Sequence, residues 1–580
     1  MKIANLLPSK IIFFLVASTL ILGLNLTPLV LQTQHSPSER TFALIHNNAQ
    51  DFFFYQSLMN EGASGQWLTT DPYTSESHSS SFIFSYFLMM GKLAHFLHLP
   101  YSILYHLLRI SLSILYLLFT FYFLLFLKIP FPRLTFLFFL FASPVMRLYN
   151  ENGKIFPAPF MYWWTGMDPI RRAAYLPHHI FGALGLIVSL YLIIKYQKYP
   201  QIKYIICLSL IALFLAFIHT PSLFILLLII PPAFIIYLIE NLPASAGSRN
   251  LRENLKIKNY FGLFGYWSIG FLALFFMVSQ TNHGFPWSQY IEWEKRFQFP
   301  LDKELIGALG ILVPFSVIGL ISALLSKKFI SILIACWFFV PFLLIPFAPA
   351  LGISNIRLIQ GVPYLPLAIL ASLGLKTIFL RGASFFEHSH LFERATKNIW
   401  KDKESSRESL GGAQKKSSDL SKKQNLFLSL ILILFFLFTL PTLSWSIKDQ
   451  IKEFWPIYGN VYFDNRLTQT FDFINANFPP KTVSLSTFYT GNYLPAFTHT
   501  ISFIGHSGYT YNLDKKQQLV DKFFNNNLAD SEAKTFLSDN HITLIFQGPE
   551  EKPIYPGYLY PNLLKPVYDK QEATIYISNF

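Results

Sequence analysis

The sequence predicts a polytopic α-helical membrane protein of about 11 transmembrane helices, followed by a C-terminal extracytoplasmic α/β domain. Hydrophobic residues make up 52% of the 580 residues and charged residues only 13%, whereas soluble proteins carry about 25% charged residues. Apolar runs long enough to cross a hydrocarbon core recur along the chain. After residue 447 the pattern changes to short strand-like and helix-like runs, which is typical of an α/β domain.

The apolar runs that are predicted to cross the bilayer follow one another with short connections. They lie near residues 11–31, 101–127, 131–148, 176–195, 203–219, 221–240, 260–280, 304–326, 329–350, 357–380 and 425–447. The first run follows Lys2 and Lys10, and no small-residue cleavage site comes after it. We therefore interpret it as an uncleaved anchor.

A further apolar run, 81–99, contains Lys92, His95 and His98. Cytoplasmic loops of membrane proteins are enriched in lysine and arginine. If 81–99 does not cross, every basic loop falls on the side of the N-terminus, and if it crosses, most of them face outward. The charge pattern therefore predicts an amphipathic or re-entrant element and a multi-pass protein of the cell membrane with a cytoplasmic N-terminus. The net charge of +14 is assigned to these loops, and no nucleic-acid partner is predicted.

This topology divides the chain into a transmembrane module, 1–447, and an extracytoplasmic domain, 448–580. Loop 32–100 is expected outside, with interfacial helices, and linker 381–424 is expected in the cytoplasm. The part of the linker from 400 to 424 is rich in Ser, Lys and Gly, which predicts disorder. The C-terminal domain contains strand-like runs such as KTVSLSTFY and HITLIFQG, and its sequence shows no metal-ligand spacing, phosphate loop or nucleophile elbow.

The first outer loop is both acidic and aromatic. Asp51 and Tyr55 are four residues apart, which would put them on one helical face, and Glu76 lies just before the interfacial run. A carboxylate held at the membrane surface can accept a proton from an incoming hydroxyl. The alternative is that these acids are solvated loop residues.

The next outer loop, YWWTGMDPIRRAAYLPHH, contains Asp168, Arg171, Arg172 and His178. Arginine pairs suit phosphate because the guanidinium fork matches phosphate oxygens. The alternative is an aromatic belt with arginines that reach to the interface. The neighbouring histidines are a weak indication of a metal site, since no full ligand set accompanies them.

Two more arginines are candidates because of their position in the predicted spans. Arg109 lies near the outer end of the second span, and a membrane-embedded arginine is costly unless it is paired. Arg357 opens the tenth span on the outer side. It could face a lipid phosphate or serve as an anchor.

The first 110 residues contain one ordered set of acidic, aromatic, glycine, proline and basic residues. They are Asp51, Tyr55, Gly65, Trp67, Pro72, Tyr73, Glu76, Gly91, Lys92 and Arg109. With this pattern the chain resembles the C-type glycosyltransferase superfamily, which includes protein O-mannosyltransferases and the aminoarabinose transferase acting on lipid A. In that superfamily the first outer loop carries an acidic catalytic residue and forms short helices parallel to the membrane. The chain departs from several relatives in two places: Phe52 follows Asp51 where they have a second acid, and SESHSSS replaces a Lys-Pro-Pro or His-Pro-Pro.

The resemblance implies a glycosyltransferase that uses a sugar carried by a polyprenyl phosphate. Asp51 would act as general base on an acceptor hydroxyl, with inversion at the anomeric carbon, and Glu76 would be the candidate second acid. The leaving phosphate would be bound by cations chosen from Arg171, Arg172, His178, Arg109 and Arg357, and the substrate would be lined by Tyr55, Trp67 and Asp168. No metal ligand is assigned and no cofactor is required, although a divalent metal stays an alternative because some relatives use one.

Two other classes of function compete with this hypothesis. One is a transporter or flippase of lipid-linked sugars, and the other is a non-catalytic membrane assembly protein that binds partners through 448–580. The later spans show neither an internal repeat nor many ionisable residues, which are typical of transporters. The sequence does not specify the sugar, or whether the acceptor is a protein, a lipid or a glycan.

Overall fold

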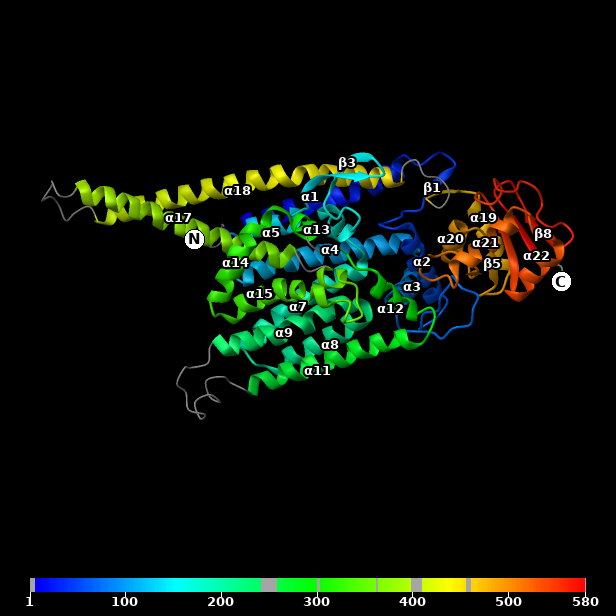
Figure 1. The fold of residues 1–580 in the computed structure, drawn as a ribbon, viewed down its shortest axis with the longest axis horizontal. Helices are drawn as coiled ribbons and strands as arrows, with labels where there is room; N and C mark the ends of the chain where they lie inside the picture. The colour runs from blue at the N-terminus through cyan, green and yellow to red at the C-terminus, as the bar shows by residue number, and fades with distance from the viewer. Residues whose placement is uncertain are drawn as a thin grey trace.

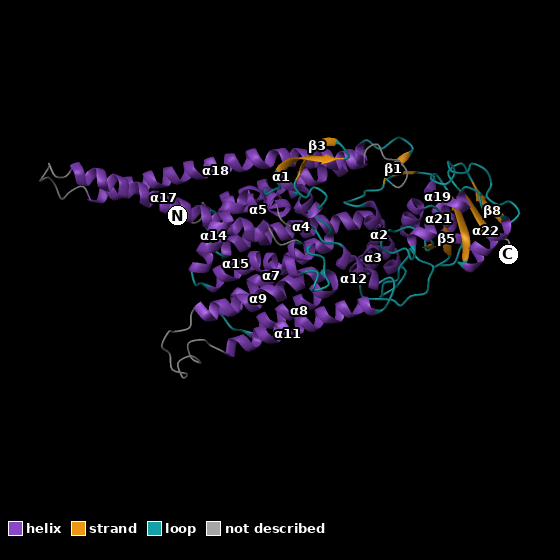
Figure 2. Ribbon diagram, in the orientation of Figure 1, coloured by secondary structure: helices purple, strands orange, loops and turns teal. Residues whose placement is uncertain are grey.

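The computed structural model describes residues 6–240, 258–299, 303–360, 364–397, 409–454 and 461–578. It contains a bundle of long helices with a smaller domain of helices and strands at one end (Figure 1). Most of the strands lie in that smaller domain (Figure 2). The predicted fold class, a polytopic helical membrane protein with a C-terminal α/β domain, is confirmed.

Among the described residues, eight helical segments are long and apolar enough to cross a membrane. They are α1 (Leu6–Gln34), α4 (Tyr101–Phe126), α7 (Pro177–Lys198), α9 (Thr220–Glu240), α11 (Lys258–Ser279), the run α13 (Lys303–Leu309), η3 (Gly310–Leu312) and α14 (Val313–Leu325), α15 (Phe329–Leu344) with η4 (Ile345–Phe347), and α18 (Ser409–Phe454). Shorter apolar helices occupy the other predicted spans, namely α5 (Pro132–Phe141), α8 (Ile202–Ile218) and the first part of α17 (Tyr364–Lys397). Each predicted span therefore coincides with an apolar helix, and the chain is a multi-pass membrane protein.

The third predicted span, 131–148, is shorter in the structure than in the prediction. Helix α5 has 10 residues, which is about 15 Å and too short to cross a bilayer alone. It ends before Pro144, which cannot continue a helix. The chain then forms the antiparallel hairpin of β2 (Met146–Glu151) and β3 (Lys154–Pro159).

The predicted linker 381–424 is largely helical in the structure. Residues 381–397 belong to α17 and residues 409–424 to α18, whereas 398–408 lie outside the described residues. The prediction of disorder for 400–424 is therefore wrong for the part that is described. The physical reason is that helix formation propagates at low cost from the apolar span into a Lys- and Gln-containing segment.

Helices α2 (Ala49–Ala63) and α3 (Ser85–Leu97) lie at the end of the bundle that adjoins the C-terminal domain (Figure 1). They cross at two glycines. A Cβ atom on Gly91 would lie 1.8 Å from the carbonyl oxygen of Met59, and one on Gly62 would lie 2.1 Å from that of Leu88. Helix α3 has 13 residues, which is about 20 Å and shorter than the hydrocarbon core. The run 81–99 therefore contains no helix long enough to cross by itself.

The C-terminal domain is built on a five-stranded sheet of order β6-β5-β7-β9-β8. Strand β5 (Val483–Leu485) is parallel to β6 (Ile501–Ser502) and to β7 (Ile542–Gln547), and β9 (Thr574–Ser578) is antiparallel to β7 and to β8 (Leu564–Asp569). The helices of the domain are α19 (Leu467–Asn477), α20 (Phe488–Phe497), α21 (Leu513–Phe524) and α22 (Asp530–Asp539).

The C-terminal domain is joined to the first outer loop through the backbone. Strand β1 (Arg40–Phe42) pairs with β4 (Tyr462–Asp464), with Arg40 opposite Asp464. The side-chain amide of Gln32, near the end of α1, donates to the carbonyl of Ile451 in α18 at 2.8 Å. Since α1 and α18 lead into these two strands, this pairing ties the start of the outer loop to the start of the domain. The division at 447/448 stays a prediction, because α18 runs through it.

We expect Gly91→Ala to lower the midpoint temperature of thermal unfolding, because overpacking a close helix crossing costs about 1–3 kcal/mol. Gly23→Ala in α1 is the matched control, since a Cβ atom there meets no heavy atom within 4 Å. Thermal unfolding of the detergent-solubilised variants and of wild type measures the two changes in midpoint temperature. Equal midpoints for the two variants would contradict the packing argument.

Candidate active site at the junction of the bundle and the C-terminal domain

Asp51 lies in the first turn of α2. The side chain of Asn48 caps this helix and accepts the backbone N–H groups of Gln50 at 2.8 Å and of Asp51 at 3.3 Å. A carboxylate in the first turn is stabilised by the helix dipole. Residues 52–55 are all buried, whereas the Asp51 side chain is 43% exposed. The local sequence therefore puts the aromatic rings into the core and leaves the carboxylate accessible on a fixed helix.

Buried tyrosines surround the Asp51 carboxylate. Burial raises the pKa of Tyr55 well above its ordinary value, and the charge of Asp51 raises it further. The pKa values of Tyr175 and Tyr290 are raised by burial and by Asp51 as well. These phenols are neutral at physiological pH, so they present hydroxyl groups near Asp51 without adding charge.

Arg357, in the short helix α16 (Ile356–Ile359), is a cation whose charge reaches the same phenols. It lowers the pKa of Tyr175 and of Tyr290, against the larger effect of burial. Its Nε atom donates to Glu294 Oε1 at 2.7 Å, and a terminal nitrogen donates to Gln360 Oε1 at 2.9 Å. A negative and a positive side chain therefore lie near one group of tyrosines.

Three histidine rings lie in the same region. His178 and His179 are in the first turn of α7, and His219 lies directly before α9. The ring centroids of His178 and His179 are 4.5 Å apart, as are those of His179 and His219. Nδ1 of His178 and Nε2 of His219 are buried without a hydrogen-bond partner among the described residues.

The histidine rings connect the surroundings of Asp51 with those of Arg357. The His178 ring lies 5.6 Å from the ring of Tyr55. The Asp51 charge contributes to the raised pKa of Tyr55. The two ring nitrogens of His179 lie 3.1 and 3.2 Å from Nε2 of Gln360, whose amide oxygen accepts from Arg357. Ring contacts therefore lead from Tyr55 to His178 and His179, and hydrogen bonds lead from His179 through Gln360 to Arg357.

Among the residues that the structure describes, no group of three or more His, Cys, Asp or Glu side chains is arranged to hold a metal ion.

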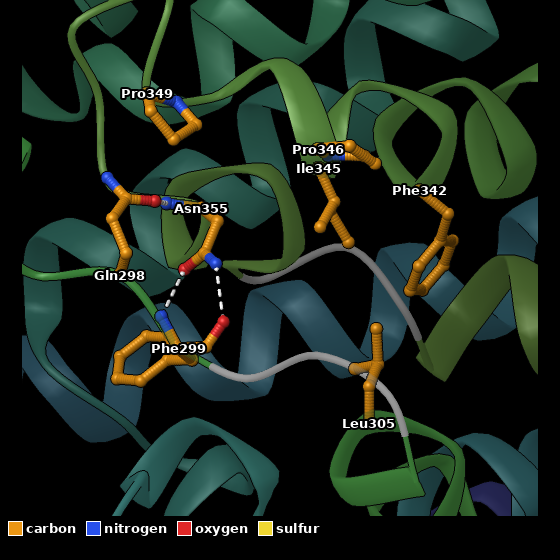
Figure 3. Close-up of a pocket in the computed structure, with 8 residues that line it drawn as sticks. All are labelled: Gln298, Phe299, Leu305, Phe342, Ile345, Pro346, Pro349 and Asn355. Carbon is orange, nitrogen blue, oxygen red and sulfur yellow. Dashed lines mark hydrogen bonds between the residues drawn. The ribbon is translucent and has the colours of Figure 1, made fainter.

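A pocket with a volume of about 530 Å³ adjoins the segment that carries Arg357. In Figure 3 the Asn355 side chain bridges to the backbone of Phe299, accepting its N–H at 3.1 Å and donating to its carbonyl at 2.9 Å. The wall is mostly apolar and consists of Gln298, Phe299, Leu305, Phe342, Ile345, Pro346, Pro349 and Asn355. Asn355, which lines the pocket, lies two residues before Arg357 in the sequence.

Asp168 and Arg171 join α6 (Pro169–Ala173) to α18. Asp168 Oδ1 accepts the backbone N–H groups of Ile170 and Arg171, and Oδ2 accepts the hydroxyl of Ser446. A terminal nitrogen of Arg171 lies 3.2 Å from Asp449 Oδ2. Both residues therefore hold the second outer loop in place, and the Arg171 charge also lowers the pKa of Tyr175, which burial raises.

Arg172 and Arg109 bind carbonyl oxygens of the protein. Arg172 donates to the carbonyls of Met167 at 3.1 Å and Ala142 at 2.7 Å, which ties α6 to the end of α5. Arg109 donates to Asn25 Oδ1 and to the carbonyl of Ala174, each at 2.6 Å. These contacts assign both side chains a structural role, and a phosphate would have to displace those acceptors.

Glu76 and Trp67 lie in different surroundings from Asp51. Glu76 Oε2 accepts from Lys516 Nζ of the C-terminal domain at 2.9 Å, and from the hydroxyl of Thr74. Trp67 follows the C-terminal end of α2, is 67% exposed and packs against Lys92. Since α2 has 15 residues and is about 22 Å long, the structure does not bring Trp67 together with Asp51.

Several residues near the site were not predicted from the sequence: Glu294, Gln360, His219 and His506. His506 belongs to the C-terminal domain, and its Nε2 atom lies 3.6 Å from Asp51 Oδ1. These residues are 168 to 455 positions away from Asp51 in the sequence, so no local pattern could have linked them to it. The segment 283–298 gave a weak signal, because its sequence is amphipathic, and it contains helix α12 (Ser288–Arg296).

Glu61, near the C-terminal end of α2, is a half-buried acid that affects stability. It accepts the Thr70 hydroxyl at 2.5 Å and the Thr70 backbone N–H at 3.3 Å. Burial raises its pKa from 4.5 to about 7, against the effect of these hydrogen bonds. The folded protein therefore favours the protonated form of Glu61.

Because the pKa of Glu61 is higher in the folded chain, Glu61 destabilises the fold increasingly as the pH rises from about 4.5 to about 7. Glu61→Gln imitates the protonated form. In a series of thermal melts, we expect the unfolding temperature of Glu61→Gln minus that of wild type to increase between pH 5 and pH 8. Glu39→Gln, on an exposed acid, should show no such trend, and a constant difference between Glu61→Gln and wild type would contradict the raised pKa.

The fold was compared with known proteins. No family model and no curated protein matches the sequence. The oligosaccharyltransferase of Archaeoglobus fulgidus, solved with a tethered acceptor peptide, is 13% identical, and the match covers 93% of this chain and 69% of that one with a TM-score of 0.51. ArnT from Cupriavidus metallidurans, solved with undecaprenyl phosphate, is 12% identical over 96% of this chain and 97% of that one, with a TM-score of 0.44. The first likeness shows that this chain shares its fold with that oligosaccharyltransferase.

Proposed function

We propose that the protein is a membrane glycosyltransferase that moves a sugar from a polyprenyl-phosphate donor to an acceptor hydroxyl on the extracytoplasmic side. The observation that carries the proposal is the exposed Asp51 carboxylate on a fixed helix, with Arg357 acting on the same buried tyrosines. The shared fold with an oligosaccharyltransferase supports this class of reaction.

Asp51 would act as the general base. Its carboxylate would accept the proton of the acceptor hydroxyl while the hydroxyl oxygen attacks the anomeric carbon and the bond to the phosphate breaks. A single displacement of this kind inverts the configuration at that carbon. The neutral phenols of Tyr55 and Tyr175 would line the space beside the carboxylate, where they can hydrogen-bond to sugar hydroxyls.

The leaving phosphate gains negative charge as the bond breaks, so fixed cations near it stabilise the transition state. Arg357 is the best placed of the predicted cations, because its charge acts on Tyr175 and Tyr290, on which the Asp51 charge also acts. His178 would contribute a ring nitrogen that has no partner among the described residues. Arg171 is the next candidate, whereas the carbonyl contacts of Arg109 and Arg172 count against them.

The apolar pocket next to Asn355 suits the first isoprene units of a polyprenyl chain. Its wall of leucine, isoleucine, phenylalanine and proline side chains would favour hydrocarbon over water. A polyprenyl phosphate seated there would have its chain in the pocket and its phosphate towards Arg357.

A transporter of lipid-linked sugars and a non-catalytic assembly protein remain the alternatives. A transporter would need its polar groups near the bilayer midplane, whereas His178, His179 and His219 lie at helix starts that share one region with Asp51. An assembly protein would have no need of an exposed carboxylate and a cation that act on the same buried tyrosines.

We expect Asp51→Asn to reduce release of polyprenyl phosphate by about 10²–10⁴-fold, because the amide cannot accept the proton. The assay uses purified protein in lipid nanodiscs and a panel of polyprenyl-phosphate sugars. Asp472→Asn, the same change on an exposed acid of α19, should leave turnover unchanged. Equal turnover of Asp51→Asn and wild type would remove Asp51 from catalysis, and tight donor binding without turnover by wild type would favour the transporter.

We expect Arg357→Gln to weaken binding of undecaprenyl phosphate by about 10-fold or more, because charged hydrogen bonds contribute about 1.5–3 kcal/mol. Binding of uncharged undecaprenol should not change. Arg147→Gln is the matched control. Arg147 of β2 pairs with the partly buried Glu304 of α13, as Arg357 pairs with the partly buried Glu294.

Removal of Arg357 leaves Glu294 without its cation, which could itself weaken anion binding. The double variant Arg357→Gln/Glu294→Gln removes that charge and should still bind undecaprenyl phosphate weakly. Wild-type affinity in the double variant would contradict a direct role of Arg357.

A further inference from the structure

A histidine of the C-terminal domain faces the Asp51 carboxylate. His506 lies in the loop that follows β6, and its Nε2 atom is 3.6 Å from Asp51 Oδ1. The His506 side chain is 7% exposed, whereas that of Asp51 is 43% exposed. A side chain 455 positions away in the sequence thus lies within ion-pairing distance of Asp51.

The hydrogen bonds of the ring assign its proton. Nδ1 of His506 accepts the backbone N–H of Gly508 at 3.0 Å. In a neutral imidazole one nitrogen accepts and the other carries the hydrogen, so Nε2 is the donor. Nε2 is buried and makes no hydrogen bond with any described residue, and leaving a buried donor unpaired costs about 1–3 kcal/mol. The Asp51 carboxylate is the acceptor placed to relieve that cost after a movement of well under 1 Å.

The His506 ring is held in this orientation by packing and by backbone contacts. It packs against the rings of Tyr509, Phe54 and Tyr73 with centroid distances of 4.6, 5.6 and 5.5 Å. The backbone N–H of His506 donates to the hydroxyl of Thr510 at 3.1 Å. These contacts leave the ring little freedom to turn Nε2 away.

The same loop is fastened to α2 next to Asp51. The hydroxyl of Ser507 donates to Gln50 Oε1 at 3.0 Å, and the side-chain amide of Asn492 donates to the Gln50 carbonyl at 3.3 Å. The histidine and the aspartate are therefore held by neighbouring residues on both sides. Contacts of this kind hold a base in a fixed orientation, and the contacting residues take no part in the reaction themselves.

We propose that His506 is a positioning residue for Asp51. Its Nε2–H group donates to Oδ1 of the carboxylate and leaves Oδ2 free to accept the proton of the acceptor hydroxyl. The C-terminal domain thereby completes the active site, and 448–580 is needed for turnover. This inference rests on the proposed function, because it requires Asp51 to be the base.

The test compares His506→Phe with His506→Gln in the full-length protein in nanodiscs. Phenylalanine keeps the ring packing and lacks the N–H group, whereas the glutamine amide places an N–H near the position of Nε2. We expect His506→Phe to lower kcat for polyprenyl-phosphate release by about 10-fold or more with little change in KM for the donor, in keeping with a base that is misoriented. His506→Gln should recover most of the loss. His499→Phe, on an exposed histidine of the same domain, should match wild type.

A second comparison isolates the action through Asp51. In the Asp51→Asn background, His506→Phe should cause no further loss, because the base that it orients is gone. Wild-type turnover in His506→Phe, equal loss in His506→Gln and His506→Phe, or a full additional loss in the Asp51→Asn background would each overturn the inference. Absence of turnover in wild type would instead overturn the proposed function, and this inference with it.

Discussion

Helix α2 is packed from two sides, and the geometry around Asp51 depends on that packing. On one side the glycines Gly62 and Gly91 let α2 and α3 approach until backbone touches backbone. On the other side the amide of Asn60 donates to the carbonyl of Thr498 at 2.8 Å, which fixes α2 against the end of α20. Protein interiors are close-packed, so a shift of α2 would move the Asp51 carboxylate relative to the tyrosines, the histidines and the C-terminal domain together.

The same packing explains why polar groups can gather in so apolar a protein. Buried polar atoms are costly unless they are paired, and Arg357 is paired with both Gln360 and Glu294. A few stay unpaired among the described residues, including Nδ1 of His178 and Nε2 of His506. Unpaired buried groups are retained where a bound molecule or a small movement can satisfy them, which is what a binding site requires.

The long helices and the C-terminal domain could be predicted because their signals are local. Apolar runs of about 20 residues and strand-like runs such as HITLIFQG, which contains β7, are visible in any window of the sequence. The end of α5 near Pro144 and the helical start of α18 were missed, because helix boundaries depend on small local differences in free energy. Among the site residues, Asp51, Tyr55, His178 and Arg357 gather in one region, whereas Trp67 and Glu76 have other neighbours.

The sequence by itself determined that this is a multi-pass membrane protein with an α/β domain at its C-terminal end, and it singled out an acid in the first outer loop. Composition and periodicity carry that information, because transfer into a bilayer depends on each segment alone. Only the tertiary structure decided which charges meet. It paired Arg171 with Asp449, used Arg109 and Arg172 to bind carbonyls, and brought His506 to Asp51 across 455 positions. Such pairings depend on how helices pack in three dimensions, and no local property of the chain records them.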